Sequence, residues 1–161
     1  MSKGAFRSSR TKVIIGDGCD FVADTNDRYD VIIVDSTDPI GPGEALFTKE
    51  FYKNCHSRLK KGGILVNQNG VPFFQGQNLA HSHKYLRGIF KDTTIYLTVV
   101  PTYVGGQMAL GWSSDFKSYR SISKDILAVR YKEANLHTRY YSPDIHAASF
   151  ILPPFIQDIM I

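Results

Sequence analysis

The chain has 161 residues, a formal net charge of +4, 43% hydrophobic and 12% aromatic residues. This apolar content suits one globular core, and no apolar run approaches the roughly 20 residues of a membrane helix. The basic residues are scattered, with only Lys60 and Lys61 adjacent, so the charge does not indicate a nucleic-acid partner.

The N-terminus and the cysteines bear on location and on metal binding. Residues 1–10 are charged and lack the apolar centre of a secretory signal. Cys19 and Cys55 form neither a disulfide framework nor a C-x-x-C pair. His81 and His83 are two residues apart and would face different ways on a helix. We therefore expect a cytoplasmic protein with no membrane segment and no metal site.

In chain order, short apolar runs alternate with segments of helical period. Predicted strands cover residues 11–18, 29–35 and 63–68, and predicted helices cover residues 19–25, 48–60 and 77–90. Two further strands, 94–100 and 107–113, are joined by the loop 101–106 and should pair antiparallel at the sheet edge. A helix over 118–134 and a short last helix beginning near Pro154 complete the prediction.

Continuous apolar strands separated by helices are typical of a parallel sheet covered on both faces. The pattern predicts an α/β fold with a doubly wound sheet, mostly parallel, with an antiparallel hairpin at its edge. Such nucleotide-binding sheets open with a strand and a glycine-rich loop, and no G-x-G-x-x-G precedes Val13. Residues 1–161 are therefore interpreted as one domain that is the C-terminal part of a larger, N-terminally truncated fold.

Ligands of open α/β sheets bind beyond the carboxyl ends of the strands. Three segments of this chain directly follow a predicted parallel strand: residues 16–18, 35–42 and 67–70. Their polar residues should converge on one site.

The segment D-S-T-D-P-I-G-P carries two carboxylates, Asp35 and Asp38, on a loop stiffened by Pro39 and Pro42 and able to turn at Gly41. A lone aspartate after a strand commonly serves as a turn or cap residue. Here the second carboxylate, the prolines and the place at a strand end favour a ligand pocket instead.

Two other residues have two interpretations each. Asp17 lies between Gly16 and Gly18, where it either caps the following helix or accepts a hydrogen bond from an exocyclic amine, with Gly18 permitting close approach. Tyr103, in the P-T-Y-V-G-G loop, is either a lid over the pocket or a surface aromatic.

Five motifs, in this order and spacing, resemble spermidine synthases, the polyamine aminopropyltransferases. They are I-G-D-G (15–18), V-D-S-T-D-P-I-G-P (34–42), L-F-T-K-E-F-Y (46–52), Q-N-G (68–70) and P-T-Y (101–103). The closing R-Y-Y-S-P-D-I-H-A-A-S-F-I-L-P segment is similar to the end of the bacterial enzymes. The resemblance covers essentially the whole chain and implies a Rossmann-like sheet of the methyltransferase type.

The resemblance implies transfer of an aminopropyl group from decarboxylated S-adenosylmethionine to putrescine, giving spermidine and methylthioadenosine. It implies Asp35 as proton acceptor, with the amine held by the backbone of Asp35, Ser36, Thr37 and Asp38, by the Asp38 carboxylate, and by Gln68 and Tyr103. Asp17 and Gly18 would contact the adenine of the donor, and Pro42 its thioadenosine portion. The donor is a co-substrate, no prosthetic group is implied, and the intact family members are expected to be homo-oligomers.

Family members also carry a small N-terminal β domain, a G-G-G-D-G-G loop and an acidic residue for the donor ribose, and the sequence contains none of these. The resemblance therefore does not by itself imply turnover by the isolated chain. Two alternatives stay open: a methyltransferase that uses S-adenosylmethionine, and a non-catalytic fragment that associates with a partner. The paired carboxylates suit a diamine better than most methyl acceptors, which favours the aminopropyltransferase.

Overall fold

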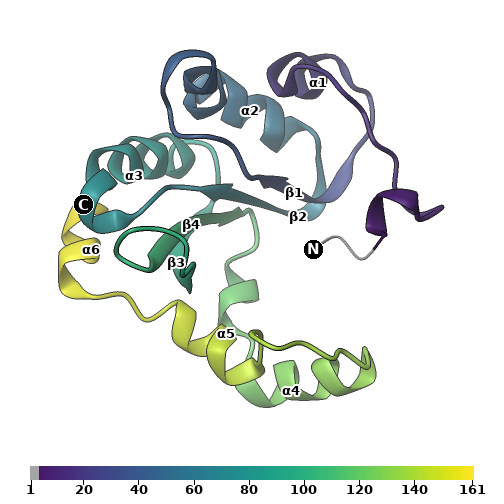
Figure 1. Ribbon diagram of the computed structural model, residues 1–161, viewed down its shortest axis with the longest axis vertical. Helices are drawn as coiled ribbons and strands as arrows, with labels where there is room; N and C mark the ends of the chain where they lie inside the picture. The colour runs from purple at the N-terminus through teal and green to yellow at the C-terminus, as the bar shows by residue number, and fades with distance from the viewer. Residues whose placement is uncertain (1–3) are drawn as a thin grey trace.

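The computed structural model describes residues 4–161, and its centre is a four-stranded sheet in the order β1-β2-β4-β3 (Figure 1). Strands β1 (Tyr29–Val34) and β2 (Leu59–Gln68) are parallel. Strand β4 (Gln107–Ser114) runs antiparallel to β2 and to β3 (Asp92–Val99). Residues 1–3 lie outside the described range, and they belong to the N-terminal segment 1–10 in which the sequence showed no secretory signal.

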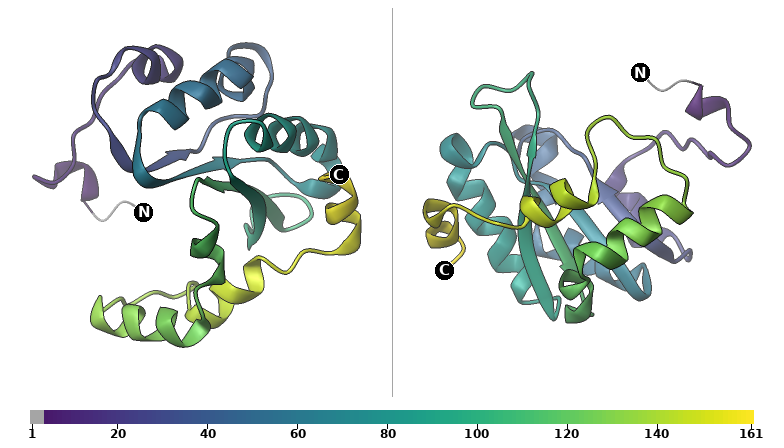
Figure 2. Two further views of the ribbon diagram at one scale, coloured as in Figure 1. Left: turned by 180° about the vertical axis from the view of Figure 1, so that it is seen from behind. Right: turned by 90° about the horizontal axis from the view of Figure 1, so that it is seen from below.

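Helices cover both faces of this sheet (Figures 1 and 2). One face carries α1 (Gly18–Asp24), α2 (Lys49–Ser57), α3 (Pro72–Arg87) and α6 (Pro154–Ile159). The other face carries α4 (Lys124–Glu133) and α5 (Pro143–Ser149). None of the helices in residues 4–161 combines the length and hydropathy that crossing a bilayer requires.

The alternation of side chains along β2 explains the two layers. Leu65 is fully buried in a cluster with Tyr52 and Cys55 of α2, whereas Ile64 and Val66 point to the face covered by α4 and α5. Burying a side chain of this size contributes about 1.5 to 3 kcal/mol. The α/β class and the antiparallel edge hairpin are thus confirmed.

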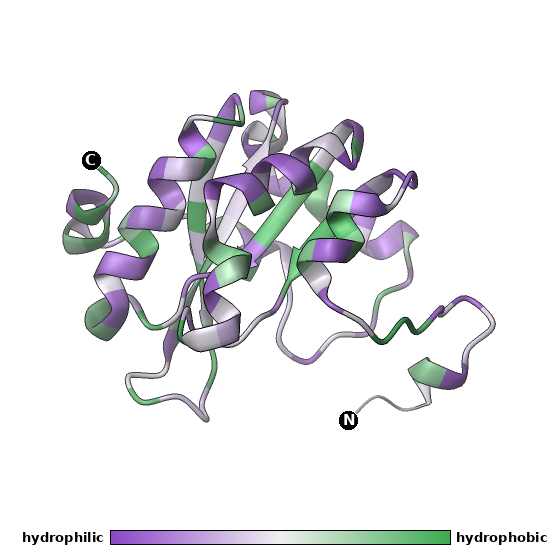
Figure 3. Ribbon diagram, turned by 90° about the horizontal axis from the view of Figure 1, so that it is seen from above, coloured by the Kyte–Doolittle hydropathy of each residue, from purple (hydrophilic) through white to green (hydrophobic). Residues whose placement is uncertain are grey.

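The prediction of a strand over residues 11–18 is wrong: the structure has no strand there. Residues 11–15 pair with no strand among residues 4–161, and Ile15 is 98% exposed. Figure 3 draws this stretch between the N-terminus and α1 as a hydrophobic segment outside the layers. A β-branched run becomes a strand only when a neighbouring edge takes its backbone hydrogen bonds. The sheet is therefore mixed, with one parallel pairing instead of a mostly parallel set.

Other boundaries shift for local reasons. Thr48 caps α2 as predicted, accepting from Phe51 N at 3.2 Å, but the helix ends at Ser57 and residues 60–63 join β2. The helix expected over 118–134 divides into a 3-10 turn and α4, since Ser123 caps a new start at Lys124. Helix α5 was not predicted, although Ser142 accepts from Ile145 N as its cap.

A pH dependence of stability is expected from His83, which is 7% exposed on α3. Burial, assisted by Arg87, lowers the pKa of this imidazole, so the folded chain takes up the proton at a lower pH than the unfolded chain does. Below a pH of about 6.5 the unfolded chain takes up the proton first, and the free energy of unfolding should fall with the pH. Urea titrations from pH 7.5 to 5 should show a shallower fall for His83→Gln, and an unchanged slope would contradict this. The exposed His81→Gln is the matched control.

Candidate active site

A cavity of about 330 Å³ lies between α1, β1 and α2 and extends along β1 from Tyr29 to Ser36, just beyond the end of the strand. Three of the residues predicted for the site line it: Gly18 at the start of α1, and Asp35 and Ser36 after β1. Apolar side chains form the rest of its lining, among them Phe21 of α1 and Phe51 of α2. The cavity thus places an apolar surface beside a carboxylate, as a ligand with a flat apolar part and a polar end requires.

The loop after β1 presents both carboxylates to solvent. Asp35 and Asp38 are exposed, and the loop turns where Ile40 N donates to Asp38 O at 2.7 Å. Gly41 has a φ of +58°, a conformation that glycine adopts without strain, and it starts a 3-10 helix over Gly41–Phe47. The Oγ of Ser36, which belongs to the lining of the cavity, is buried and has no hydrogen-bond partner among residues 4–161.

Gly43 sets how closely the chain packs against this loop. A Cβ at this position would lie 2.6 Å from Asp38 O and 2.7 Å from Thr37 Oγ1. Both distances are below van der Waals contact, so a side chain here would displace the backbone that carries Asp38.

We therefore expect Gly43→Ala to cost about 1 to 3 kcal/mol of folding stability, the usual range for overpacking. Urea denaturation measures this, and the backbone NMR signals of Thr37 and Asp38 should move most. Gly16→Ala is the control, because its Cβ would meet no atom within 4 Å. Equal stability of the two variants would show that the loop tolerates the extra carbon.

Gln68 joins the end of β2 to the loop after β1. Its side chain is 3% exposed; Nε2 donates to Thr37 O at 3.2 Å, and Oε1 accepts from Gly70 N at 2.7 Å. Two of the three segments expected to converge, residues 35–42 and 67–70, are thus in direct contact.

The remaining predicted residues are Asp17, Pro42 and Tyr103. Asp17 caps α1: its Oδ1 accepts from Cys19 N at 2.7 Å and from Asp20 N at 3.3 Å. Of the two roles that the sequence left open for Asp17, this oxygen has the helix-capping one. Pro42 is exposed in the 3-10 helix. Tyr103 is 52% exposed and does not line the cavity. Within the described residues, no group of three His, Cys, Asp or Glu side chains is arranged to hold a metal ion.

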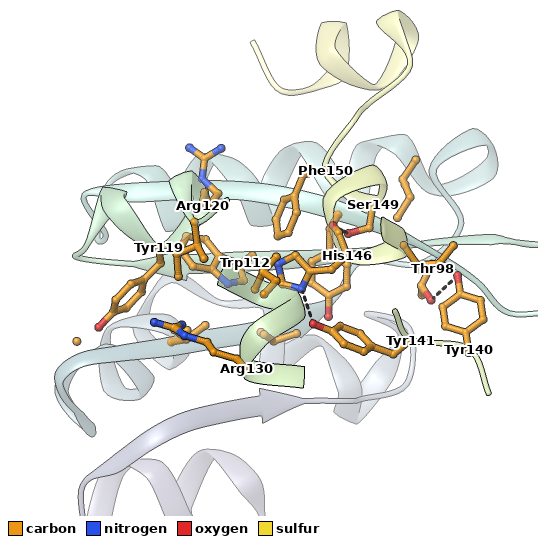
Figure 4. A pocket seen from close by; sticks show the side chains of 18 residues that line it. Thr98, Trp112, Tyr119, Arg120, Arg130, Tyr140, Tyr141, His146, Ser149 and Phe150 are labelled. Atoms are coloured by element: carbon orange, nitrogen blue, oxygen red, sulfur yellow. Dashed lines mark hydrogen bonds between the residues drawn. The ribbon is translucent and has the colours of Figure 1, made fainter. Parts of the chain in front are cut away.

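A second, larger cavity of about 550 Å³ lies on the opposite face, between the sheet and helices α4 and α5 (Figure 4). Its lining is mainly apolar and aromatic, with Trp112 and Phe150 packed edge to face and His146 Nδ1 3.3 Å from Tyr141 Oη. None of the predicted site residues belongs to it. Asp35 lines the smaller cavity, and Asp38 follows it on the same loop outside the lining, so the smaller cavity is the candidate site.

Sequence reasoning missed the apolar lining of the candidate cavity. Phe21, Leu46 and Phe51 line it, yet they have the spacing of ordinary core residues and nothing in the sequence marks them as ligand contacts. One signal could have identified them. They lie on the helices that directly follow two of the predicted polar segments, residues 16–18 and 35–42.

The sheet with helices on both faces and a site beyond the end of β1 defines an α/β protein of the methyltransferase type. Human methyltransferase-like protein 13 in complex with SAH shares this fold, with a TM-score of 0.56 at 21% identity over 84% of this chain and 64% of that one. A spermidine synthase solved with the transition-state analogue AdoDATO is more similar, with a TM-score of 0.88 at 30% identity over 99% of this chain and 53% of that one.

A family model described as the spermine/spermidine synthase domain matches residues 1–121, and the chain belongs to this family. It is 47% identical over 159 residues to a polyamine aminopropyltransferase of Ruegeria sp. (strain TM1040), covering 99% of this chain and 56% of that protein. The protein of the same name from Pseudomonas syringae pv. tomato is 46% identical over 155 residues, 96% of this chain and 54% of that protein. The chain spans about half the length of the curated relatives it matches.

Proposed function

We propose that this chain carries the acceptor site of an aminopropyltransferase, which transfers the aminopropyl group of decarboxylated S-adenosylmethionine to putrescine. The observation that supports this most is the loop from Asp35 to Asp38 beside an apolar cavity, in a chain of the spermine/spermidine synthase family. In this proposal the 161 residues form one domain, which corresponds to the C-terminal part of the intact enzyme.

The acceptor chemistry explains why a carboxylate is needed. A primary amine has a pKa of about 10.4, so releasing its proton at pH 7 costs roughly 4 to 5 kcal/mol. In our proposal Asp35 orients the amine and accepts this proton as the nitrogen attacks the aminopropyl carbon next to sulfur. The new C–N bond replaces the C–S bond, the bonding electrons pass to sulfur, and neutral methylthioadenosine leaves.

The other residues have supporting roles. We assign Asp38 to the second ammonium group of the diamine, with Gln68, Tyr103 and the backbone of Ser36 and Thr37 completing the acceptor site. Gly18, which lines the cavity, and Asp17, whose Oδ1 caps α1, would lie on the adenine side of the donor, and Pro42 on its thioadenosine side. Since Asp17 Oδ1 serves the helix, its Oδ2 is the atom we propose for the adenine amine.

Location and assembly complete the proposal. Cys19 and Cys55 are free thiols, as is typical of the reducing cytoplasm, where we propose that the protein acts. We also propose that the working enzyme is a homo-oligomer, with neither nucleic acid nor membrane as a partner.

The direct test supplies the chain with decarboxylated S-adenosylmethionine and putrescine and quantifies nucleosides and amines by mass spectrometry. Equal amounts of methylthioadenosine and spermidine are expected. A parallel reaction with S-adenosylmethionine distinguishes a methyltransferase, which would release S-adenosylhomocysteine. If the folded chain released neither nucleoside and failed to bind methylthioadenosine in calorimetry, the proposed function of this chain would be rejected.

A further inference from the structure

Four buried polar side chains from three elements meet behind the candidate site. They are Tyr52 of α2, Ser82 of α3, and Asn67 and Asn69 at the end of β2, and each is at most 2% exposed. Buried polar groups of this kind are stable only when they bond to one another. We refer to them as the amide–hydroxyl cluster.

Hydrogen bonds connect all four members. Ser82 Oγ lies 2.9 Å from Tyr52 Oη and accepts from Asn67 Nδ2 at 3.0 Å. The amide of Asn69 accepts from Asn67 Nδ2 at 3.0 Å; in the reverse orientation it accepts from Gly111 N at 3.1 Å and donates to Ser82 Oγ at 2.9 Å. Burial raises the pKa of Tyr52 to about 12, so its hydroxyl keeps its proton. Either orientation therefore ties Asn69 to the cluster.

Gly111 of β4 makes the space for this arrangement. It is the ladder partner of Asn67, and a Cβ on Gly111 would lie 2.2 Å from Asn67 Oδ1 and 2.9 Å from Asn69 Nδ2. No amide atom tolerates a carbon at such a distance. The two asparagine side chains therefore occupy the volume that any other residue at position 111 would fill.

The cluster fixes the residue that holds the carboxylate loop. Asn67 and Asn69 flank Gln68 in sequence, and strand alternation directs their side chains to the same face, toward α2 and α3. Asn69 N also donates to Ala109 O at 2.9 Å, so the backbone around Gln68 is held from β4 as well. The remaining freedom of Gln68 is its side chain, which spans from Gly70 N to Thr37 O.

We propose that Tyr52, Asn67, Asn69 and Ser82 are positioning residues, which hold the end of β2 so that Gln68 clamps Thr37 and fixes the two carboxylates for the amine. The part of this inference that concerns the amine rests on the proposed function. The part that concerns the clamp does not, because it predicts the state of Gln68 and Gly70 in the chain without ligand.

Gly111→Ala is the most selective test, because the new methyl group would push the side-chain amides of Asn67 and Asn69 and leave Gln68 itself unchanged. In ¹⁵N NMR spectra of the full chain, the Gly70 N–H and the Gln68 side-chain amide should shift and lose protection from solvent exchange. Putrescine should bind about tenfold more weakly by calorimetry, the effect of losing about one hydrogen bond. Gly88→Ala is the matched control, since its Cβ would have an ordinary contact of 3.4 Å with Tyr85 O.

A double substitution separates positioning from general damage. Asn67→Ala removes the nearer of the two side chains that the new methyl group would meet, so the effect of Asn67→Ala/Gly111→Ala should be smaller than the sum of the two single effects, as expected for sites in contact. If Gly111→Ala did not fold, Tyr52→Phe and Ser82→Ala, which each remove one hydroxyl, would take its place. Their Gly70 and Gln68 signals should move in the same direction, by a smaller amount.

Each outcome supports or rejects a stated part of the proposal. Unchanged Gly70 and Gln68 signals in a folded, destabilised Gly111→Ala variant would overturn the positioning role and leave the cluster as core. Shifted signals with unchanged putrescine affinity would overturn its link to the amine. If the unmodified chain bound no putrescine, the proposed function would fail, while the two amide signals would still establish or reject the clamp.

Discussion

Asp35→Asn is expected to lower the rate of aminopropyl transfer by about 10²- to 10⁴-fold, the usual contribution of a positioned general base. The asparagine side chain has the same shape as aspartate, so the loop and the exposed surface around it should be unchanged. It cannot take the proton of the attacking amine, so the free energy of releasing that proton to water adds to the activation free energy of the transfer. Methylthioadenosine release at saturating substrate concentrations measures the effect.

The matched control is Asp30→Asn on the same strand. Asp30 is exposed and pairs with Lys60 Nζ at 2.8 Å, near the opposite end of β1, so this variant should keep the rate of the unmodified chain. A rate for Asp35→Asn within twofold of that control would show that Asp35 does not accept the proton. A reduced affinity for putrescine with an unchanged maximal rate would assign Asp35 to binding alone.

The second large effect is expected on self-association. Strand β1 pairs with β2 on one side, and within residues 4–161 no strand takes its other side. Val31 and Ile33 are 49% and 70% exposed along it. An edge with free backbone groups and apolar side chains is a template for pairing with another copy. We therefore expect concentration-dependent dimers or larger species of the isolated chain, formed through β1.

Ile33→Lys should convert these species to monomers, because a lysine on an edge strand opposes edge-to-edge pairing. Light scattering over a range of concentrations measures the mass directly. Val129→Lys on α4 places the same charge at a side chain that is 56% exposed and distant from the edge, and it should leave association unchanged. A monomeric unmodified chain at high concentration would contradict the expectation.

Local signals in the sequence predicted much of this fold. The apolar run at residues 29–35, the cap at Thr48 and the loop that joins β3 and β4 each depend on neighbours within a few residues, and all three were predicted in place. Residues 11–18 have a strand-forming composition, yet a strand also needs a partner from elsewhere. Pairing over long sequence distances leaves no trace in the segment itself, and here the prediction was wrong.

The candidate site shows the same division. Asp35, Asp38 and their prolines lie in one continuous motif, so the spacing alone predicted two carboxylates at a strand end. The polar residues in the apolar run of β2 were a signal too, but their meaning depends on Tyr52 and Ser82, which lie 15 residues to either side of Asn67. Only the packed structure shows that Asn67 and Asn69 face inward while Gln68 reaches the loop.

The one-sided attachment of β1 has a consequence for motion. The carboxylate loop leaves a strand whose ladder has a single neighbour, whereas β2 and β4 are each bonded on both sides. Amide hydrogens of β1 should therefore exchange with solvent before those of β2, through openings that leave the rest of the sheet closed. A molecule that touches both the start of α1 and the loop after β1 would slow this exchange. Ligand binding at the site and the local opening of β1 are thus coupled equilibria.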